Sequence, residues 1–373
     1  MPQIENNSKS SIGRVIVKVV SLFVVFNFLF IGFDQATIGK ISLYNSILPG
    51  RERLPFGENP TRSYNLTINN IEAMFSSLRL AGEAKKQDEY RVFIVGDSSV
   101  WGSLQKNSDT LSGQLNNLNL MSCDGKRMDF YNLGYPTLTI FKDLMIIDRA
   151  LAYHPDLILW LVTLESFPRE NQTNSELLKN NAPLINQIVK QYGLDSSYYF
   201  DEPTFLDRTF LNQRRNLADL ARLQAYGIMW AATGIDQDLN SPYTPARRDF
   251  EQDDTFHGEG QRDLESELSM DVLEMAIKRI SVPVILINEP ILISQGENSE
   301  VRYNYYYPRW AFEQYRAIIK NTFDKFKTPF YDFYNLVPED MFTNSAIHLN
   351  RDGEDLLVKE ITSILKNNYC LAP

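Results

Sequence analysis

The stretch Arg91-Val92-Phe93-Ile94-Val95-Gly96-Asp97-Ser98-Ser99 joins an apolar run to a glycine and two serines, and a helical stretch follows it. This pattern predicts a buried strand whose carboxyl end carries Ser98. Ligands of parallel α/β sheets bind at that end of the strands, so Ser98 lies where a nucleophile is expected. Gly96 permits a tight turn, and the helix behind it offers free N–H groups to an oxyanion. A plainer role is also open, because Asp97 and Ser98 are common helix caps.

Short apolar runs and helical stretches alternate along the rest of the chain, as in a parallel sheet with helices on both faces. The runs that predict strands are 91–95, 128–132, 155–162, 282–288 and 329–333. The stretches that predict helices beside them are 111–120, 141–153, 310–326 and 352–367. The predicted fold class is therefore α/β.

Two further polar blocks follow predicted strands or precede a helix. Gly134 comes just after the second strand, where a residue without a side chain can present its N–H to an oxyanion or can simply form a turn. His348 lies in a loop before the last helix. A serine becomes a useful nucleophile only when a base removes its proton, so we expect His348 to lie near Ser98.

The order of these blocks resembles that of the SGNH, or GDSL-type, hydrolases, over residues 91–167 and 282–365. The resemblance implies a flavodoxin-like three-layer α/β/α sandwich with a five-stranded parallel sheet. It implies that Ser98 is the nucleophile and first oxyanion donor, Gly134 the second donor, and His348 the general base. No cofactor is expected, and neither is a metal site, because no cluster of His, Cys, Asp and Glu has ligand spacing in the sequence.

Two positions depart from the pattern of that family. Leu164 stands where the family has an oxyanion asparagine, and Ser345 stands where it has the aspartate that orients the histidine. A backbone carbonyl, Ser345 itself or Asp352 could orient His348 instead. Glu165 and Asp97 are further accessory candidates, although the charge of Glu165 would oppose an oxyanion.

Composition excludes several other classes of protein. Thirty-seven Lys and Arg against 47 Asp and Glu give a net charge of -10, which argues against nucleic acid as a partner. Two cysteines, Cys123 and Cys370, cannot build a disulfide framework or a four-thiolate zinc site, although they could pair with each other. Of the other histidines, His154 is expected to be structural, and His257 would reach the site only through a folded loop.

Residues 15–33 form a nearly continuous apolar run, just long enough to cross a bilayer core of roughly 30 Å. We expect an uncleaved anchor, with a signal peptide or a buried core helix as alternatives. Three cations, Lys9, Arg14 and Lys18, lie on the amino-terminal side, and three others, Lys40, Arg51 and Arg53, follow the run. Because the first three are closer to it, they favour a cytoplasmic amino terminus and an extracytoplasmic body, as in a single-pass membrane protein.

The predicted organisation is a tail and anchor at 1–35, a juxtamembrane stalk at 36–90, the α/β domain at 91–167 and 281–373, and a mostly helical insertion at 168–280. Within the insertion, helices are expected at 176–192, 207–233 and 262–280, with a polar loop at 236–260. The apolar stretch 225–235 is expected to pack on the main domain rather than to meet a membrane or a partner. The aromatic run 303–310 suits either sugar stacking or internal packing.

These features predict a membrane-anchored, extracytoplasmic serine esterase or O-acyltransferase. Its expected substrate is an acylated glycan or lipid of the cell envelope, and its expected partner is a multi-span membrane acyltransferase or another membrane subunit. Because Leu164 and Ser345 depart from the family pattern, the alternative is a catalytically weak or inactive domain that serves as a binding or scaffolding subunit of a membrane complex.

Overall fold

The computed structural model describes residues 12–32, 43–48, 70–80, 84–234 and 260–369. Five strands of these residues form one parallel sheet in the order β2-β1-β3-β4-β5. This order confirms the flavodoxin-like arrangement. Every strand lies within two residues of its predicted run: β1 (Glu89–Val95), β2 (Arg127–Asn132), β3 (Leu157–Val162), β4 (Val284–Asn288) and β5 (Phe330–Asp332).

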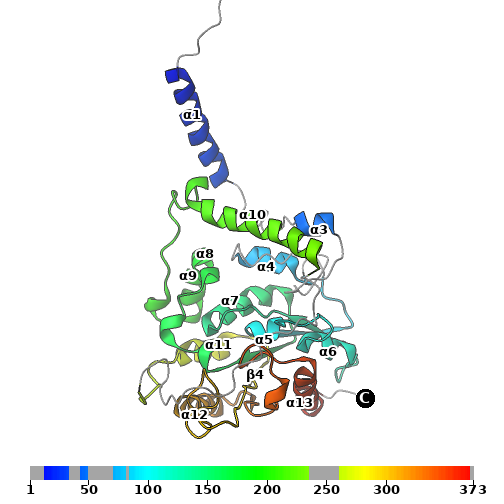
Figure 1. Ribbon diagram of the computed structural model, residues 1–373. Helices are drawn as coiled ribbons and strands as arrows, with labels where there is room; N and C mark the ends of the chain where they lie inside the picture. Colours follow the sequence, from blue (N-terminus) through cyan, green and yellow to red (C-terminus); the bar gives the residue numbers. More distant parts are fainter. Residues whose placement is uncertain (1–11, 33–42, 49–69, 81–83, 235–259, 370–373) are drawn as a thin grey trace, which may run out of the picture.

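Side chains of the central strands alternate between two apolar cores, one on each face of the sheet. Phe93 and Trp160 belong to the first core, whereas Ile94 and Leu159 belong to the second. The first core is covered by α7 (Ile140–Ala150), α11 (Met270–Arg279) and α12 (Arg309–Phe326), and the second by α6 (Leu111–Asn117) and α13 (Arg351–Tyr369). The predicted three-layer sandwich is therefore confirmed (Figure 1).

The segment between β3 and β4 shares the first core. The predicted helix at 176–192 is divided into α8 (Glu176–Asn180) and α9 (Ala182–Tyr192), which starts with a proline in its first turn. Leu177 and Ile185 are buried in the same core as the sheet. The predicted loop 236–260, apart from Gly260, and His257 within it lie outside the described residues. Short 3-10 turns lie at Leu151–Tyr153, Leu164–Ser166, Arg169–Asn171, Ser196–Tyr198 and Glu339–Met341.

The long helix α10 (Phe210–Thr233) departs from the prediction. Only Leu220, Gln224 and Gly227 of it are buried. It lies against α1 (Ile12–Ile31) and α3 (Leu43–Ile47) at one end of the molecule (Figure 1). The expectation that its apolar carboxyl half packs on the main domain is wrong, because the apolar residues surround the helix and only a narrow stripe can face inward.

The amino-terminal part contains α1 and α4 (Ile71–Ser77). Helix α1 is the single helix of the described residues that is long and apolar enough to cross a membrane, and a signal sequence would meet the same criteria. Met74 and Phe75 of α4 are buried in the first core. This part of the predicted stalk therefore packs on the α/β body.

The aromatic run after β4 contributes mainly to packing. Tyr303 and Tyr307 are buried and both contact the ring of Phe312 at centroid distances of 5.6 and 5.0 Å. Tyr306 is exposed. Tyr305 and Trp310 are half-buried and pack against the second and the first core, respectively. Internal packing thus accounts for four of the five rings of the run, and Tyr306 is the exposed one.

Candidate active site

The turn that carries Ser98 is built by its neighbours in the sequence. Asp97 caps the short helix α5 (Ser98–Trp101), since its carboxylate accepts the N–H of Ser99 at 2.7 Å. A Cβ on Gly96 would lie 2.6 Å from Val100, so glycine is required for this close approach. Ser98 therefore opens α5 directly after β1, as the sequence predicts, and the capping role expected for Asp97 holds as well.

His348 reaches the hydroxyl of Ser98. Its Nε2 lies 2.7 Å from Ser98 Oγ, within the range of a normal hydrogen bond. The loop that carries His348 is closed by Thr343, whose N–H donates to the His348 carbonyl at 2.8 Å. The two residues that the sequence predicts as nucleophile and base are therefore in contact.

The other ring nitrogen of His348 contacts a residue that the sequence analysis missed. Nδ1 lies 2.9 Å from Oδ1 of Asn344, four residues upstream. When Nδ1 carries the proton and donates to Asn344, Nε2 keeps its lone pair for the Ser98 hydroxyl. Asn344, and neither Ser345 nor Asp352, therefore orients the imidazole. The physical reason is the tight 343–348 loop, which brings the side chain at position 344 beside the ring.

The protonation state of His348 suits a base. Burial lowers the pKa of this imidazole below its ordinary value, and the nearby Asp97 carboxylate only partly opposes the shift. The ring is therefore neutral at neutral pH and ready to accept a proton.

Gly134 has a different role from the one predicted. Its N–H donates to Oδ1 of Asn132 at 2.9 Å, and the amide of Asn132 donates to the carbonyl of Val100 at 2.8 Å. A Cβ at Gly134 would lie 2.3 Å from the backbone nitrogen of Trp101. Glycine is needed here because the β2 turn presses against α5. With its N–H engaged in this way, Gly134 is not supported as the second oxyanion donor.

Leu164 and Glu165, the remaining candidates of the third block, lie in the 3-10 turn that follows β3. Leu164 is fully buried in the first core and has no side-chain donor. Glu165 is a neighbour of Tyr307: burial raises the pKa of that phenol, and the charge of Glu165 adds to the shift. Ser98 N–H, at the start of α5, is the donor that remains from the predicted oxyanion hole.

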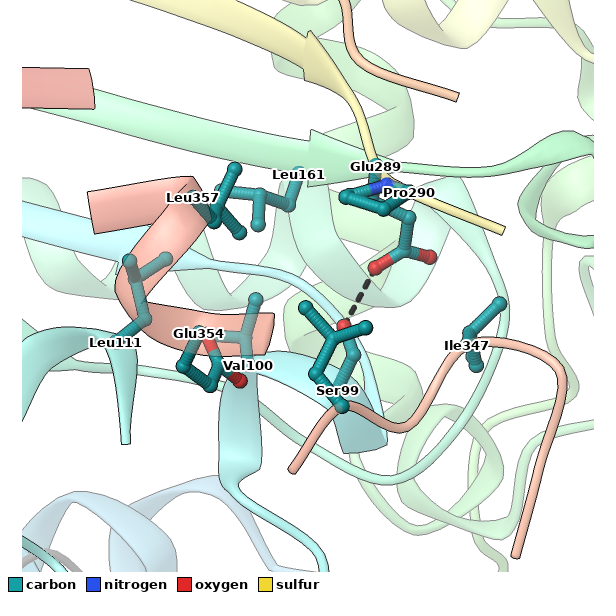
Figure 2. A pocket seen from close by; sticks show the side chains of 10 residues that line it. Ser99, Val100, Leu111, Leu161, Glu289, Pro290, Ile347, Glu354 and Leu357 are labelled. Atoms are coloured by element: carbon teal, nitrogen blue, oxygen red, sulfur yellow. Dashed lines mark hydrogen bonds between the residues drawn. The ribbon is translucent and has the colours of Figure 1, made fainter. Parts of the chain in front are cut away.

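Glu289 is a second polar residue that the sequence analysis did not single out. It directly follows β4, is almost fully buried, and accepts a hydrogen bond from Ser99 Oγ at 2.5 Å. Figure 2 shows this bond beside Pro290 and Ile347 in a pocket with mostly apolar walls. Burial raises the pKa of Glu289 well above its ordinary value, and the charge of Asp97 adds to this. Glu289 follows β4 at the carboxyl edge of the sheet, the same edge at which Ser98 follows β1. This position is the signal in the sequence that could have revealed it.

A buried lysine, paired with an aspartate, connects the loop that follows β1 with the loop that follows β2. Lys142 on α7 is fully buried, and its ammonium donates to the carbonyls of Gly96 and Tyr135 at 2.8 and 3.1 Å. Its partner Asp143 lies 2.5 Å away. One cation thus connects the loop after β1 with the loop after β2. This fixes the position of Ser98 relative to the second loop.

Other predicted features lie outside this site. His154 ends a 3-10 turn before β3, at the opposite end of the sheet from Ser98. Cys370 is beyond the described residues, so its pairing with Cys123 stays a prediction. Within the described part of the chain, no group of three or more His, Cys, Asp and Glu residues could hold a metal ion.

The strand order and the positions of Ser98 and His348 at one sheet edge match the layout that the sequence blocks imply. The chain has an SGNH-type α/β fold. No family model matches it, and no curated protein matches it by sequence.

Among solved structures, the chain is similar to a lipase/acylhydrolase from Enterococcus faecalis, with a TM-score of 0.35, 14% identity, and coverage of 76% of this chain and 97% of that one. It is also similar to a carbohydrate acetylesterase family member from Sinorhizobium meliloti, with a TM-score of 0.35, 11% identity, and coverage of 74% of this chain and 97% of that one. A third similar structure is an inhibitor-bound aryl esterase from M. smegmatis, with a TM-score of 0.33, 12% identity, and coverage of 74% of this chain and 99% of that one. Because these TM-scores are below 0.5, the fold assignment rests on the strand order and the placement of the sequence blocks in this chain.

Proposed function

We propose that this protein is a membrane-anchored SGNH-type serine esterase or O-acyltransferase that acts through a covalent acyl-enzyme. The observation that carries the proposal is the hydrogen-bonded series from Ser98 through His348 to Asn344. It has the order of nucleophile, base and orienting group that serine acyl transfer requires.

Each proton in the reaction has a place in this geometry. Ser98 Oγ attacks the ester carbonyl while His348 Nε2 takes the hydroxyl proton. The oxyanion of the tetrahedral intermediate lies toward the Ser98 N–H and the amino end of α5. Collapse breaks the bond to the leaving alcohol, which receives the proton from His348. Water or an acceptor hydroxyl then attacks the acyl-enzyme while His348 takes its proton. His348 returns this proton to Ser98 Oγ as the acyl–serine bond breaks, which releases the free acid or the new ester.

The membrane part of the proposal is supported by α1, whose length and apolar composition suit a single span. Arg14 and Lys18 near its amino end favour a cytoplasmic amino terminus and an extracytoplasmic body. A tethered acyl-transfer site suits an acylated glycan or lipid of the cell envelope. A multi-span membrane acyltransferase or another membrane subunit is the partner we propose for it.

A second candidate function, a binding or scaffolding subunit, is favoured by one observation. The Gly134 N–H is engaged by Asn132, and Leu164 offers no side-chain donor, so the oxyanion hole is poorer than the sequence resemblance implies. Loss of one such donor costs about 10²–10³ in rate in other serine hydrolases.

Covalent labelling separates the two functions. The full-length protein in detergent is treated with a fluorophosphonate probe, alongside Ser98→Ala and the control Ser108→Ala, an exposed serine of the same region. The enzyme proposal expects labelling of the wild type and the control and none of Ser98→Ala. An unlabelled wild type with a normal unfolding transition would contradict it and favour the scaffold. Wild-type protein that has not been treated with the probe is then supplied with an ester substrate and a sugar alcohol, and the products show whether water or the alcohol takes the acyl group.

A further inference from the structure

Helix α10 presents an apolar face that the body of the protein leaves exposed. Its inner stripe, centred on Leu220, Gln224 and Gly227, is buried. On the outer side, Leu211 is 50% exposed and Met229 59% exposed. Tyr226 is also exposed and stacks on Trp230 at a centroid distance of 6.0 Å. An exposed apolar surface of this kind marks an interaction site.

The amino end of α10 meets the last turns of α1. The ring of Phe210 contacts the rings of Phe26 and Phe30 at 5.0 and 5.6 Å. Asn27, the single buried residue of α1, accepts the Leu211 N–H at 3.2 Å. Figure 1 shows α10 lying across the lower end of α1. The exposed face of α10 is therefore continuous with the end of the candidate membrane span.

Neighbouring segments extend the same apolar surface. Phe205 and Leu206, just before α10, are exposed, and Phe205 contacts Phe28 of α1 at 5.4 Å. Leu43 and Ile47 of α3 are exposed as well, and the Leu43 N–H donates to Gln224 of α10 at 2.9 Å. Outside α1, most of the exposed large apolar side chains of the described residues belong to this surface.

The charge of this surface is opposite to that of the whole protein. Residues 205–233 contain four arginines and two aspartates, whereas the chain carries a net charge of -10. The arginines, all exposed, are Arg208, Arg214, Arg215 and Arg222. Arginine stems can lie along apolar surface while their charged heads reach anionic headgroups.

We propose that α10, α3 and residues 205–206 form an interfacial surface that lies in the headgroup region of the bilayer that α1 enters, in contact with anionic phospholipid. The proposal rests on the proposed membrane anchoring of α1. An exposed apolar face with arginines beside it and aromatic residues at both ends suits a helix lying in the plane of a membrane surface. Helices α4 and α7 then lie between the lipid and the sheet (Figure 1), and the body is held at a fixed height rather than swinging on its linker.

The test measures depth in lipid with the full chain. In a background with Cys123→Ser and Cys370→Ser, three single-cysteine variants carry an environment-sensitive fluorophore. Met229→Cys reports on α10, Val20→Cys on the middle of α1, and Lys359→Cys on an exposed position of α13 as the control. Each is reconstituted into phosphatidylcholine–phosphatidylglycerol vesicles that contain lipids with a nitroxide quencher either near the headgroup or deep in the acyl chain.

We expect the dye at position 229 to lose at least half of its fluorescence with the shallow quencher, the dye at position 20 with the deep quencher, and the dye at position 359 with neither. If the dye at position 20 is quenched and the dye at position 229 is not, the interfacial surface is overturned while the anchor stands. The same result is expected if the natural occupant of the exposed face of α10 is a protein rather than lipid. Absence of deep quenching at 20 overturns the anchor and this proposal together. Equal quenching at 229 in vesicles without phosphatidylglycerol overturns the role given to anionic lipid.

Discussion

Ser98 Oγ lies 2.7 Å from His348 Nε2, although 250 positions separate the two residues in the chain. The contact exists because β1 ends at the same sheet edge to which the loop before α13 returns. A serine bonded to a neutral imidazole is the minimum that general-base activation of a hydroxyl needs.

Replacement of His348 tests this relationship directly. We expect His348→Ala to lower kcat for a nitrophenyl ester by about 10⁶-fold, because the Ser98 proton loses its acceptor. The double variant Ser98→Ala/His348→Ala should be no worse than Ser98→Ala alone, since residues of one catalytic unit are strongly non-additive. A His348→Ala protein that keeps wild-type turnover would remove the histidine from the mechanism.

Asn344 provides the second prediction. Its amide orients His348 but carries no charge to stabilise the imidazolium. Asn344→Asp should therefore raise kcat, and it should move the acid limb of the pH–rate profile to higher pH because a carboxylate raises the pKa of His348. The rate needs neutral His348 and so falls as pH falls through the pKa of that ring. In the wild type burial lowers this pKa, and the midpoint of the acid limb should therefore lie below the ordinary imidazole value of 6.5.

Two companion variants complete the Asn344 measurement. Asn344→Ala should lower kcat with little change in KM, because the ring loses its orientation. Ser345→Ala serves as the matched control and should leave the profile unchanged, since the contact to Nδ1 comes from Asn344. An acid limb that stays in place in Asn344→Asp would show that the residue does not act on His348.

Much of this fold and the central pair of the site could be predicted from the sequence. Strand runs and the blocks around Ser98 and His348 are local patterns, and the parallel topology brings their ends to one edge. Asn344 could not be predicted, because its role depends on how Thr343 closes the loop. The engagement of Gly134 depends on an Asn132 rotamer, which a glycine in a motif does not reveal.

The exposed face of α10 was missed for a related reason. Hydrophobicity alone does not distinguish a helix packed on a core from one that faces lipid, and 225–235 is apolar in either case. The distinction depends on where α1 lies relative to α10. That position is set by contacts of Phe210 with Phe26 and Phe30, which are far away in the sequence.

Glu289 gives the third prediction. Its carboxyl accepts a hydrogen bond from the Ser99 hydroxyl and lies beside Asp97. Burial and the charge of Asp97 raise its pKa well above the ordinary value, so we expect its protonated form to persist to higher pH than in an ordinary glutamate. Glu289→Gln should therefore keep most activity near neutral pH. At alkaline pH the wild type should lose activity as Glu289 ionises next to Asp97, whereas Glu289→Gln should not. The pH–rate profiles of both proteins give the comparison, and an alkaline limb shared by both would assign it to another group.

Glu354 gives the fourth prediction, for stability rather than activity. It is buried on α13, where burial raises its pKa to about 8, and the amide of Gln105 is its neighbour at 3.5 Å. Its pKa is higher in the folded than in the unfolded chain, so the folded state holds this proton more tightly. The stabilisation is complete below the ordinary pKa of 4.5 and is lost as pH rises through about 8.

Between those two values, the free energy of unfolding of the wild type should fall by about 1.4 kcal/mol per pH unit relative to Glu354→Gln, which keeps the shape and removes the ionisation. Urea unfolding of the full chain in detergent, followed by tryptophan fluorescence from pH 5 to 8, measures this difference. Glu360→Gln, an exposed glutamate on the same helix, should show the wild-type slope. Parallel pH dependences in wild type and Glu354→Gln would mean that Glu354 is ionised in the folded protein, because only a retained proton makes the two curves diverge.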